Sequence, residues 1–598
     1  MIKKDTKTSL LIIGAMSFTT LIISPDLNDS FNIPKLFGLF VFSILGVLIL
    51  PKFSHLIRIH KQNITFWIGL LFITLMFLRS IFTDHFFTGF FGRYGRNSGW
   101  LAYFCYFLFF ILAATFTSFK LIRDSLMIIS GLGLILTIYG FMQYNDIDFI
   151  TYAHSGYPII TTFGNSNFTS SFIGISTIST FYFFFIEKSI LKKSLLLSII
   201  VIDLLLIFLS KSSQGLFVAI IGITSFILLK IFFYSQKKFL LFLPFVFGIL
   251  LTVFLGFIKI GPLKSLVYQP SVSYRGDYFR AAKDMFLSNP WFGVGIDRYG
   301  ENFRTYRDLD AAFRLGPSTT TNWAHNQILQ FFATGGVFIG IVYVVFIGVV
   351  TYASISHIKK LESTKQNIAA AIFSVWIGYL AQSQISIDQI SITLLGWIFA
   401  GFIVGIKIDN SESTRTKSIS YSSKRVHSQR IWLVLLLALS FIPLRLLWTA
   451  DHDIKLARSG VIPNSFDNSY EFAGSIINRA PNLINYRLIV ADLLASNGEY
   501  EDSEKILLEA IKIDKKSYDS LSYLARLYEL TENISGSVMI REKLLNLDRY
   551  DVENYIQLSK NYLITGEQSK YQNLIDQLTR LGVDVKYINQ MRNLNQEN

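Results

Sequence analysis

Long apolar runs alternate with short polar segments through the first 450 residues of the chain. Thirteen of these runs approach the roughly 20 apolar residues that an α-helix needs to cross a bilayer. They cover residues 8–24, 34–50, 64–82, 99–117, 124–143, 164–186, 194–210, 214–233, 239–258, 326–353, 367–384, 389–406 and 431–449. The first run lacks a small-residue cleavage site, so we interpret it as a span and not as a signal peptide. We predict an all-α fold in which residues 1–450 form a polytopic transmembrane bundle of about 12 to 13 spans.

Residues 451–598 follow a different pattern, polar and charged with apolar positions at helical spacing. Equivalent residues recur every 34 positions, as at Gly498, Glu532 and Gly566. The same period relates Val490, Leu524 and Leu558; Ala491, Ala525 and Ser559; Leu494, Tyr528 and Tyr562; and Ile506, Ile540 and Leu574. This period resembles that of tetratricopeptide (TPR) repeats, whose paired helices stack into an α-solenoid with a concave face. We predict a TPR-like domain with a possible protein partner; a plain helical cap without a partner is the alternative.

The composition identifies a membrane protein. Of the 598 residues, 51% are hydrophobic and only 16% are charged, where a soluble protein is nearer a quarter charged. The single cysteine, Cys105, lies in an apolar run, which excludes a disulfide framework and a cysteine-based zinc site. The formal charge of +14 does not require a nucleic-acid partner, because basic loops orient membrane proteins.

Basic residues are distributed unevenly between the two sides of the predicted bundle. If the N-terminus is cytoplasmic, the segments on that side hold 23 Lys and Arg residues, and the short loops on the other side hold four. The four are Arg79, Arg93, Arg96 and Lys211. Because Lys and Arg are retained on the cytoplasmic side, we predict a multi-pass protein of the cytoplasmic (inner) membrane. The loop 259–325 and the tail 451–598 then lie outside the cytoplasm.

The loop 259–325 holds nine further Lys and Arg residues and six acidic ones. Each arginine is therefore either paired with a carboxylate or available to a ligand. Apolar residues at helical spacing predict an amphipathic helix over 275–290, lying on the membrane, with Asp277 and Arg280 on its polar face. The glycines of WFGVGIDRYGENF permit tight turns after it, so we expect an ordered loop.

A polar tract, TTTNWAHN (319–326), ends in His325 and Asn326, where the next apolar run begins. An imidazole can accept a proton near neutral pH, and arginine makes bidentate contacts with phosphate oxygens. At a membrane surface these groups suit the displacement of a lipid-linked diphosphate by an acceptor hydroxyl. A structural histidine is the commoner alternative.

Five segments, in this order, resemble motifs of the O-antigen ligase and polymerase superfamily of polytopic glycosyltransferases. They are FGRYGRNSGW (91–100), TTFGNSNFTS (161–170), LSKSSQGLFVA (209–219), YRGDYFRAAKDMFLSNPWFGVGIDRY (274–299) and HNQILQFFATGGVFIG (325–340). The resemblance covers roughly residues 80–405 and implies a GT-C-like bundle. It implies a metal-independent, inverting transfer of a glycan from a polyprenyl diphosphate carrier to an acceptor hydroxyl, at the outer face of the membrane and without a cofactor.

The resemblance also implies roles for individual residues. Arg275 stands at the family's loop arginine, a diphosphate contact, and His325 at its catalytic histidine, a base or a positioner of the acceptor. Where the family has an arginine after Ser213, this chain has Gln214. We therefore expect the remaining substrate contacts to come from Arg93, Arg96, Lys211, Gln214, Arg280 and Asn326. Asn165 and Asn167 are interpreted as the start of a helix.

Several activities share this architecture. A ligase moves a finished glycan to a lipid or other envelope acceptor, a polymerase joins repeat units, and an oligosaccharyltransferase modifies a protein. The tail favours surface polysaccharide ligation or protein O-glycosylation, because it could recruit a protein acceptor or partner. If recruitment is its role, a chain cut at residue 462 would still act on a small acceptor. The rival class is a transporter or flippase of lipid-linked glycans, for which Asp203, inside an apolar run, is the one supporting residue. A membrane-anchored scaffold does not explain the basic loop.

Overall fold

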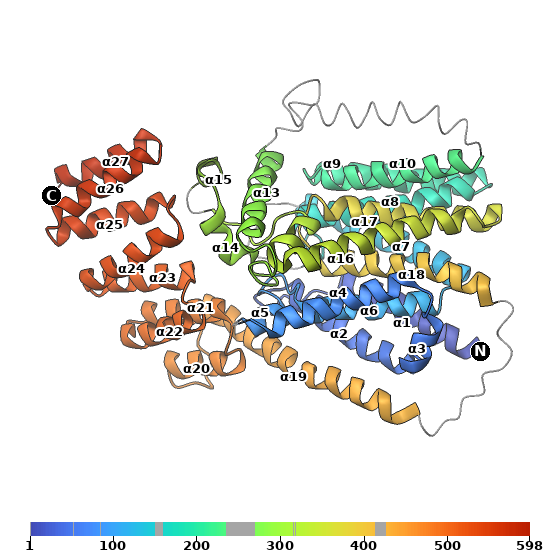
Figure 1. Ribbon diagram of the computed structural model, residues 1–598, viewed down its shortest axis with the longest axis horizontal. Coiled ribbons are helices and arrows are strands. Elements are labelled where there is room, and N and C mark those ends of the chain that lie inside the picture. The colour runs from blue at the N-terminus through green and yellow to red at the C-terminus, as the bar shows by residue number, and fades with distance from the viewer. Residues whose placement is uncertain are drawn as a thin grey trace.

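The computed structural model describes residues 2–51, 53–83, 85–149, 159–234, 270–314, 316, 319–412 and 426–597. These residues form helices and connecting turns, without a strand among them. Figure 1 shows an elongated bundle with the N-terminus at one end and the C-terminal tail at the other. The short helices of the loop that precedes His325 lie between the bundle and the tail.

Long helices of the bundle occupy twelve of the thirteen predicted spans, and the thirteenth, 239–258, lies outside the described residues. The bundle contains α1 (Ile2–Leu21), α2 (Asn32–Ile49), α3 (Phe53–Ile59), α4 (Ile64–Ile81), α5 (Phe86–Phe91), α6 (Trp100–Thr115), α7 (Phe119–Tyr144), α8 (Ser166–Ile186), α9 (Ile190–Leu209), α10 (Gln214–Tyr234), α16 (Gln327–Ile358), α17 (Ser363–Ser383), α18 (Ile390–Glu412) and α19 (Val426–Arg458). Six of them, α2, α4, α7, α8, α10 and α16, are long and apolar enough to cross a membrane.

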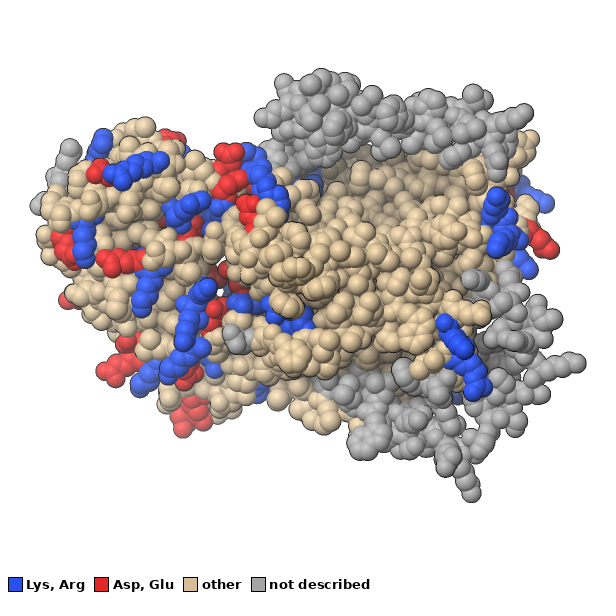
Figure 2. All heavy atoms as spheres, viewed as in Figure 1, with Lys and Arg blue, Asp and Glu red and all other residues tan. Residues whose placement is uncertain are grey.

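The centre of the bundle is α6, in which nearly every residue is buried. It packs along α18, and a Cβ added at Gly401 would lie 2.5 Å from the carbonyl oxygen of Phe110. Small residues that let helices approach this closely are typical of membrane bundles. Figure 2 shows charged side chains gathered at the two ends of the molecule, with largely uncharged surface between them. The protein is therefore a multi-pass membrane protein.

Two charged side chains inside apolar runs fasten helices together. Lys35 of α2 donates to the carbonyl oxygens of Thr19 at 2.8 Å and Thr20 at 3.1 Å, and so caps the end of α1. Asp203 of α9 accepts hydrogen bonds from Thr137 of α7 at 2.7 Å and Thr177 of α8 at 3.4 Å. Both carboxylate oxygens of Asp203 thus have partners, and the residue links three helices of the bundle.

The tail continues from α19, which crosses the predicted boundary at residue 450 and ends at Arg458. Its helices are α20 (Ser469–Arg479), α21 (Ile484–Ser496), α22 (Tyr500–Ile513), α23 (Tyr518–Leu530), α24 (Ile534–Leu547), α25 (Val552–Ile564), α26 (Gln568–Arg580) and α27 (Val585–Glu597). The starts of α21, α23 and α25 are 34 residues apart, and so are those of α22, α24 and α26. The periodic residues Val490, Leu524 and Leu558 are all buried between them. The tail is thus an array of helical hairpins with the period read from the sequence.

Each hairpin turns at the same repeat position through a left-handed backbone conformation. The φ angles are 81° at Gly498, 60° at Glu532 and 75° at Gly566. Glycine adopts this conformation freely, whereas a residue with a Cβ pays about 1–2 kcal/mol for it. The second hairpin therefore carries local strain that the first and third do not.

We predict that Glu532→Gly stabilises the second hairpin by about 1 kcal/mol, because it removes the left-handed Cβ while adding some entropy to the unfolded chain. Native-state hydrogen exchange of α23 and α24 in the full chain should slow by about fivefold. Glu532→Ala is the control and should give no gain, since alanine keeps the Cβ. Equal effects of the two substitutions would contradict this origin of the strain.

Candidate active site

His325 lies at the end of the bundle, directly before α16, with a left-handed φ of 54°. Its Nδ1 is 3.0 Å from the carbonyl oxygen of Trp323. Because a carbonyl can only accept, the neutral ring carries its proton on Nδ1 and leaves the lone pair on Nε2. The ring of Tyr278, from the loop helix α13 (Pro270–Ser288), stacks on the imidazole with centroids 4.8 Å apart. The fold therefore offers Nε2 as a proton acceptor in a fixed orientation.

The protonation state of His325 is set by its surroundings. Burial lowers the pKa of the imidazole to about 3, and the nearby positive charges of Arg275 and Arg96 act in the same direction. The ring is therefore neutral throughout the physiological range. These electrostatic effects also place His325 among arginines from two distant parts of the sequence, the loop 92–99 and α13.

Asn326 holds the start of α16 and so fixes the backbone beside His325. Its side-chain oxygen accepts from the amide of Leu329 at 2.9 Å, and its amide group donates to the carbonyl of Gln384 at 3.3 Å. This is the N-cap arrangement that asparagine favours. The side chain predicted to contact substrate is thus occupied by structural partners.

Arg96 and Arg275 lie close enough to His325 to lower its pKa, and Arg93 lies close to Arg96. The carboxylates of Asp29 and Asp297 raise the pKa of Arg96 without forming an ion pair with it. Among the described residues, Arg93, Arg96 and Arg275 form no ion pair, and each has a buried guanidinium nitrogen without a hydrogen-bond partner: Nη1 of Arg93, Nε of Arg96 and Nε of Arg275. Burial lowers the pKa of Arg96 and of Arg275, which shows that their charged forms are poorly solvated. A buried cation without a partner is costly, so this cluster is suited to an anionic ligand.

The other arginines of the described loop residues are paired with carboxylates. The sequence alone did not show which loop arginines are paired and which are available to a ligand. Arg280 bonds to Asp277 at 2.7 Å and also to Asp308. The remaining loop arginines with carboxylate partners are Arg298, Arg304, Arg307 and Arg314. Arg275 alone among the arginines of the described loop residues has none, as expected for a residue kept for a ligand.

Asp277 lies on the same face of its helix as Arg280, as predicted, but its carboxylate is buried. Asp277 is only 1% exposed, and its carboxylate is enclosed between Arg280 and Arg314, at 2.7 and 3.3 Å. Arg314 belongs to α15 (Leu309–Arg314), which packs against α13 and covers part of its polar face. The guanidinium of Arg280 is therefore bound by the carboxylates of Asp277 and Asp308, and in this structure it stabilises the loop.

Asp297, which sequence analysis did not single out, positions the loop that carries Arg93 and Arg96. Its Oδ2 accepts from the backbone amides of Arg93 at 2.6 Å and Ser98 at 3.3 Å. Burial raises the pKa of this carboxyl group to about 7, against the opposing effect of these amides and the two guanidinium groups. Nothing in the sequence distinguishes Asp297 from the other acids of the loop, because its partners lie about 200 residues away in the chain.

The glycine motifs of the loop and of α16 fit against each other. A Cβ at Gly293 would lie 2.4 Å from the backbone of Thr334, and one at Gly336 would lie 2.3 Å from the carbonyl oxygen of Trp291. Both glycines have positive φ, and Gly336 marks a kink in α16. Arg79 of α4 secures the same turn by donating to the carbonyl of Phe292 at 2.7 Å. This close docking holds Asp297 and the loop over the start of α16.

Lys211 and Gln214 lie between α9 and α10. Gln214 is buried and accepts from the hydroxyl of Ser171 at 3.3 Å, whereas Lys211 is exposed. No described contact connects either residue with His325 or Arg275. Asn165 caps α8 by accepting from the amide of Asn167 at 2.8 Å, so the predicted helix start is confirmed.

We predict that Asp297→Ala loosens the loop 92–99, because it leaves the amides of Arg93 and Ser98 buried without an acceptor, at about 1–3 kcal/mol each. Hydrogen exchange of these amides should become at least about tenfold faster. Asp297→Asn keeps an accepting oxygen and should stay close to wild type. If the alanine variant retains full protection, Asp297 does not position this loop.

Part of the chain matches a family of known proteins. Residues 194–344 match the family model described as O-antigen ligase. The matched segment includes Arg275, Asp297 and His325. No curated protein matches the chain. The match supports a place in the O-antigen ligase superfamily and, in general terms, glycan transfer from a lipid-linked donor to a glycan acceptor.

Proposed function

We propose that this protein transfers a glycan from a polyprenyl diphosphate carrier to an acceptor hydroxyl, with inversion and without a metal ion. The observation that carries the proposal is that Arg96 and Arg275 act on the neutral imidazole of His325, and that both, like Arg93, keep a buried guanidinium nitrogen without a hydrogen-bond partner among the described residues. The diphosphate is an anion that matches their charge and their hydrogen-bond geometry.

The reaction is a single displacement at the anomeric carbon. Nε2 of His325 accepts the proton of the acceptor hydroxyl while its oxygen forms the new bond to that carbon. The bond from the carbon to the carrier diphosphate breaks, and the leaving diphosphate keeps the electron pair. The arginines stabilise the charge that develops on it, so no general acid is needed. Attack opposite the leaving group inverts the configuration.

Donor binding strengthens the base. Arg275 and Arg96 both lower the pKa of His325 when the site holds no anion. A diphosphate bound between them supplies compensating negative charge and raises the pKa of the imidazole toward its ordinary value. The imidazole is therefore a stronger proton acceptor when the diphosphate is in place.

The site faces outward from the cytoplasm in this proposal. The tail and the loop helices α14 and α15, which precede His325 in the chain, lie at the end of the bundle opposite the N-terminus (Figure 1). The basic loops at the other end indicate the cytoplasmic side. A carrier lipid in the outer leaflet then presents its diphosphate to the arginines at the membrane surface. Gln214 supplies no charge, so Arg93 and Arg96 take the place of the family's additional arginine.

The tail supports ligation to an envelope acceptor or protein O-glycosylation in preference to polymerisation. Its helical hairpins, which repeat every 34 residues, lie at the same end of the bundle as the loop helices α14 and α15, and we interpret them as a TPR-like solenoid. A hollow of about 560 Å³ between α24, α25 and α26 is lined by Tyr555, Tyr562 and Lys570 among others. Concave faces of such arrays bind peptides and proteins, and this hollow is where an acceptor protein or partner would dock.

We predict that His325→Ala lowers transfer at least about a hundredfold, the contribution typical of a general base. Single-turnover transfer from a polyprenyl-diphosphate-linked glycan, measured with protein in nanodiscs, checks this outcome. In cells the unused lipid-linked glycan should accumulate, and mass spectrometry of the lipid extract also separates polymerase from ligase. Accumulated single repeat units indicate a polymerase, and complete unattached chains indicate a ligase or an oligosaccharyltransferase.

The matched control is His452→Ala, at an exposed histidine of α19 that bonds only to its neighbour Asp453. It should leave transfer unchanged. Near-normal transfer by the His325 variant at equal abundance would refute the proposed base.

A further inference from the structure

Helix α14 (Tyr299–Tyr306) lies between the candidate active site and the tail. Its inner face is fixed to α13, because the hydroxyl of Tyr299 donates to the carbonyl of Tyr278 at 2.7 Å. The rings of Phe303 and Tyr278 are also in contact, with centroids 5.8 Å apart. Since Tyr278 stacks on His325, any displacement of α14 is transmitted directly to the imidazole.

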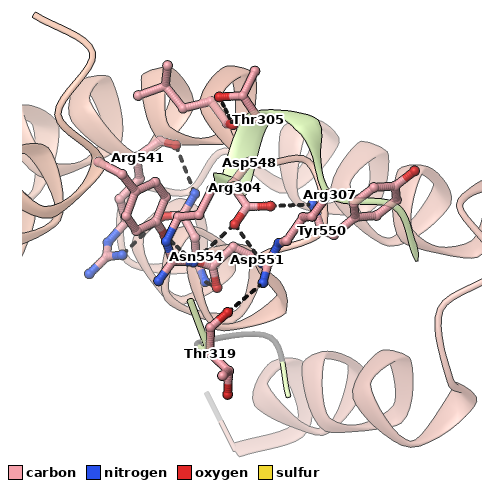
Figure 3. A network of polar contacts seen from close by, with 11 residues as sticks. Arg304, Thr305, Arg307, Thr319, Arg541, Asp548, Tyr550, Asp551 and Asn554 are labelled. Atoms are coloured by element: carbon pink, nitrogen blue, oxygen red, sulfur yellow. Dashed lines mark hydrogen bonds and ion pairs between the residues drawn. The ribbon is translucent and has the colours of Figure 1, made fainter. Parts of the chain in front are cut away.

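The outer face of α14 is held by the tail through ion pairs that are almost fully buried (Figure 3). Arg307, directly after the helix, bonds to Asp548 at 2.6 Å, and neither side chain is exposed. Arg304 reaches the same carboxylate at 3.0 Å and Asp551 at 3.6 Å. The hydroxyl of Thr305 donates to the carbonyl of Leu547 at 3.1 Å. The contact thus joins parts of the chain about 240 residues apart in sequence.

The acidic residues of this contact occupy one repeated position of the tail. Asp514 and Asp548 are 34 residues apart, and each follows the last residue of its helix, α22 or α24. Asp514 accepts from Arg298, directly before α14, at 2.9 Å. Consecutive hairpins therefore hold the two ends of the same short helix, and the spacing of the repeat matches the length of α14.

The tail side of the contact is itself rigid. The second carboxylate oxygen of Asp548 accepts from the amide of Tyr550 at 3.2 Å, and the hydroxyl of Tyr518 donates to Asp551. The guanidinium of Arg304 also stacks over the ring of Tyr518 at 4.1 Å. Because these further partners orient the carboxylates of Asp548 and Asp551, the ion pairs hold α14 in one position relative to the tail. Removal of one partner of a buried ion pair is destabilising.

We propose that Asp548 and Asp514 are positioning residues for the transfer reaction: they hold α14, which seats Tyr278 against His325. This inference rests on the proposed function of His325. The tail is then a part of the catalytic unit, and not a separable arm that only recruits a partner. A chain cut at residue 462 would leave Arg304 and Arg307 without the carboxylates of the tail and Arg298 with Glu301 alone. We therefore expect it to lose transfer to small acceptors as well, contrary to the expectation from sequence.

The test compares Asp548→Asn with Asp548→Glu and with a control, Asp576→Asn, at an exposed residue of α26 that bonds only to Gln572. Asp548→Asn should lower kcat at least about tenfold, because small misplacements of catalytic groups are costly. KM for the donor should change by less than about twofold, since the arginine cluster is untouched. Asp548→Glu keeps the charge and should recover part of the loss, and Asp576→Asn should match wild type.

Hydrogen exchange of residues 299–306 provides a readout that does not require turnover. The inference predicts faster exchange in Asp548→Asn and unchanged exchange in His325→Ala. Full protection of this segment in Asp548→Asn, or faster exchange with an unchanged kcat, would overturn the positioning role. An active His325→Ala variant would instead refute the proposed base while leaving the exchange result intact, so the two failures are distinguishable.

A cross-link tests whether the contact persists during turnover. Thr305 and Asn546 are both exposed and line the same hollow of about 1270 Å³ between α14 and the tail. Because Cys105 is buried, a short bis-maleimide should join only the introduced thiols in the double variant Thr305→Cys, Asn546→Cys. The cross-linked protein should retain most of its transfer activity, and abolished transfer after cross-linking would contradict a fixed positioning contact.

Discussion

The costly burial of positive charge without a partner is the constraint on which this structure depends. A guanidinium removed from water is stable only beside a carboxylate or another anion. Arg280, Arg298, Arg304, Arg307 and Arg314 satisfy this condition within the protein. Arg93, Arg96 and Arg275 do not, within the described part of the chain, and the free energy stored in their burial is available for binding an anion. Burial keeps His325 neutral by lowering the pKa of its imidazole, and the charges of Arg275 and Arg96 act in the same direction.

The rest of the fold keeps these charges in place. The apolar bundle fixes the start of α16, where Asn326 caps the helix beside His325. The glycines of the loop and of α16 allow backbone-to-backbone docking, which brings Asp297 to the amides of the 92–99 loop. On the far side of α14, the tail supplies the carboxylates that the bundle lacks. The helical hairpins of the tail and the membrane domain are thus joined by ion pairs between the arginines of the loop and the carboxylates of the tail.

Sequence predicted the parts of this structure that depend on periodicity. Apolar runs of span length became the helices of the bundle, and a 34-residue period became hairpins whose starts keep that spacing. The identity of His325 and Arg275 as site candidates came from a motif resemblance and from their position at a polar boundary. Periodicity and short motifs are local signals, because each depends only on which residue types recur at a given spacing in the chain.

The pairing of charges depends on tertiary contacts and could not be predicted in this way. Arg307 and Asp548 are 241 residues apart, and Asp297 meets Arg93 across 204 residues. The periodicity of α13 placed Asp277 on a polar face, but it contains no information about α15, which covers that residue. Lys35 was not counted among the basic residues of the loops, because it lies within an apolar run. Its role in capping α1 becomes visible only when α1 and α2 are placed together.

The most direct test of the account is the affinity of the protein in nanodiscs for a polyprenyl diphosphate, compared with the corresponding monophosphate. The account predicts that Arg96→Gln and Arg275→Gln each weaken diphosphate binding at least about tenfold, as expected for the loss of a charged hydrogen bond. Arg314→Gln, at a half-exposed arginine already paired with Asp277 and Asp310, should bind as wild type does. Diphosphate binding that is unaffected by the first two substitutions would contradict the central claim that these unpaired arginines form the donor site.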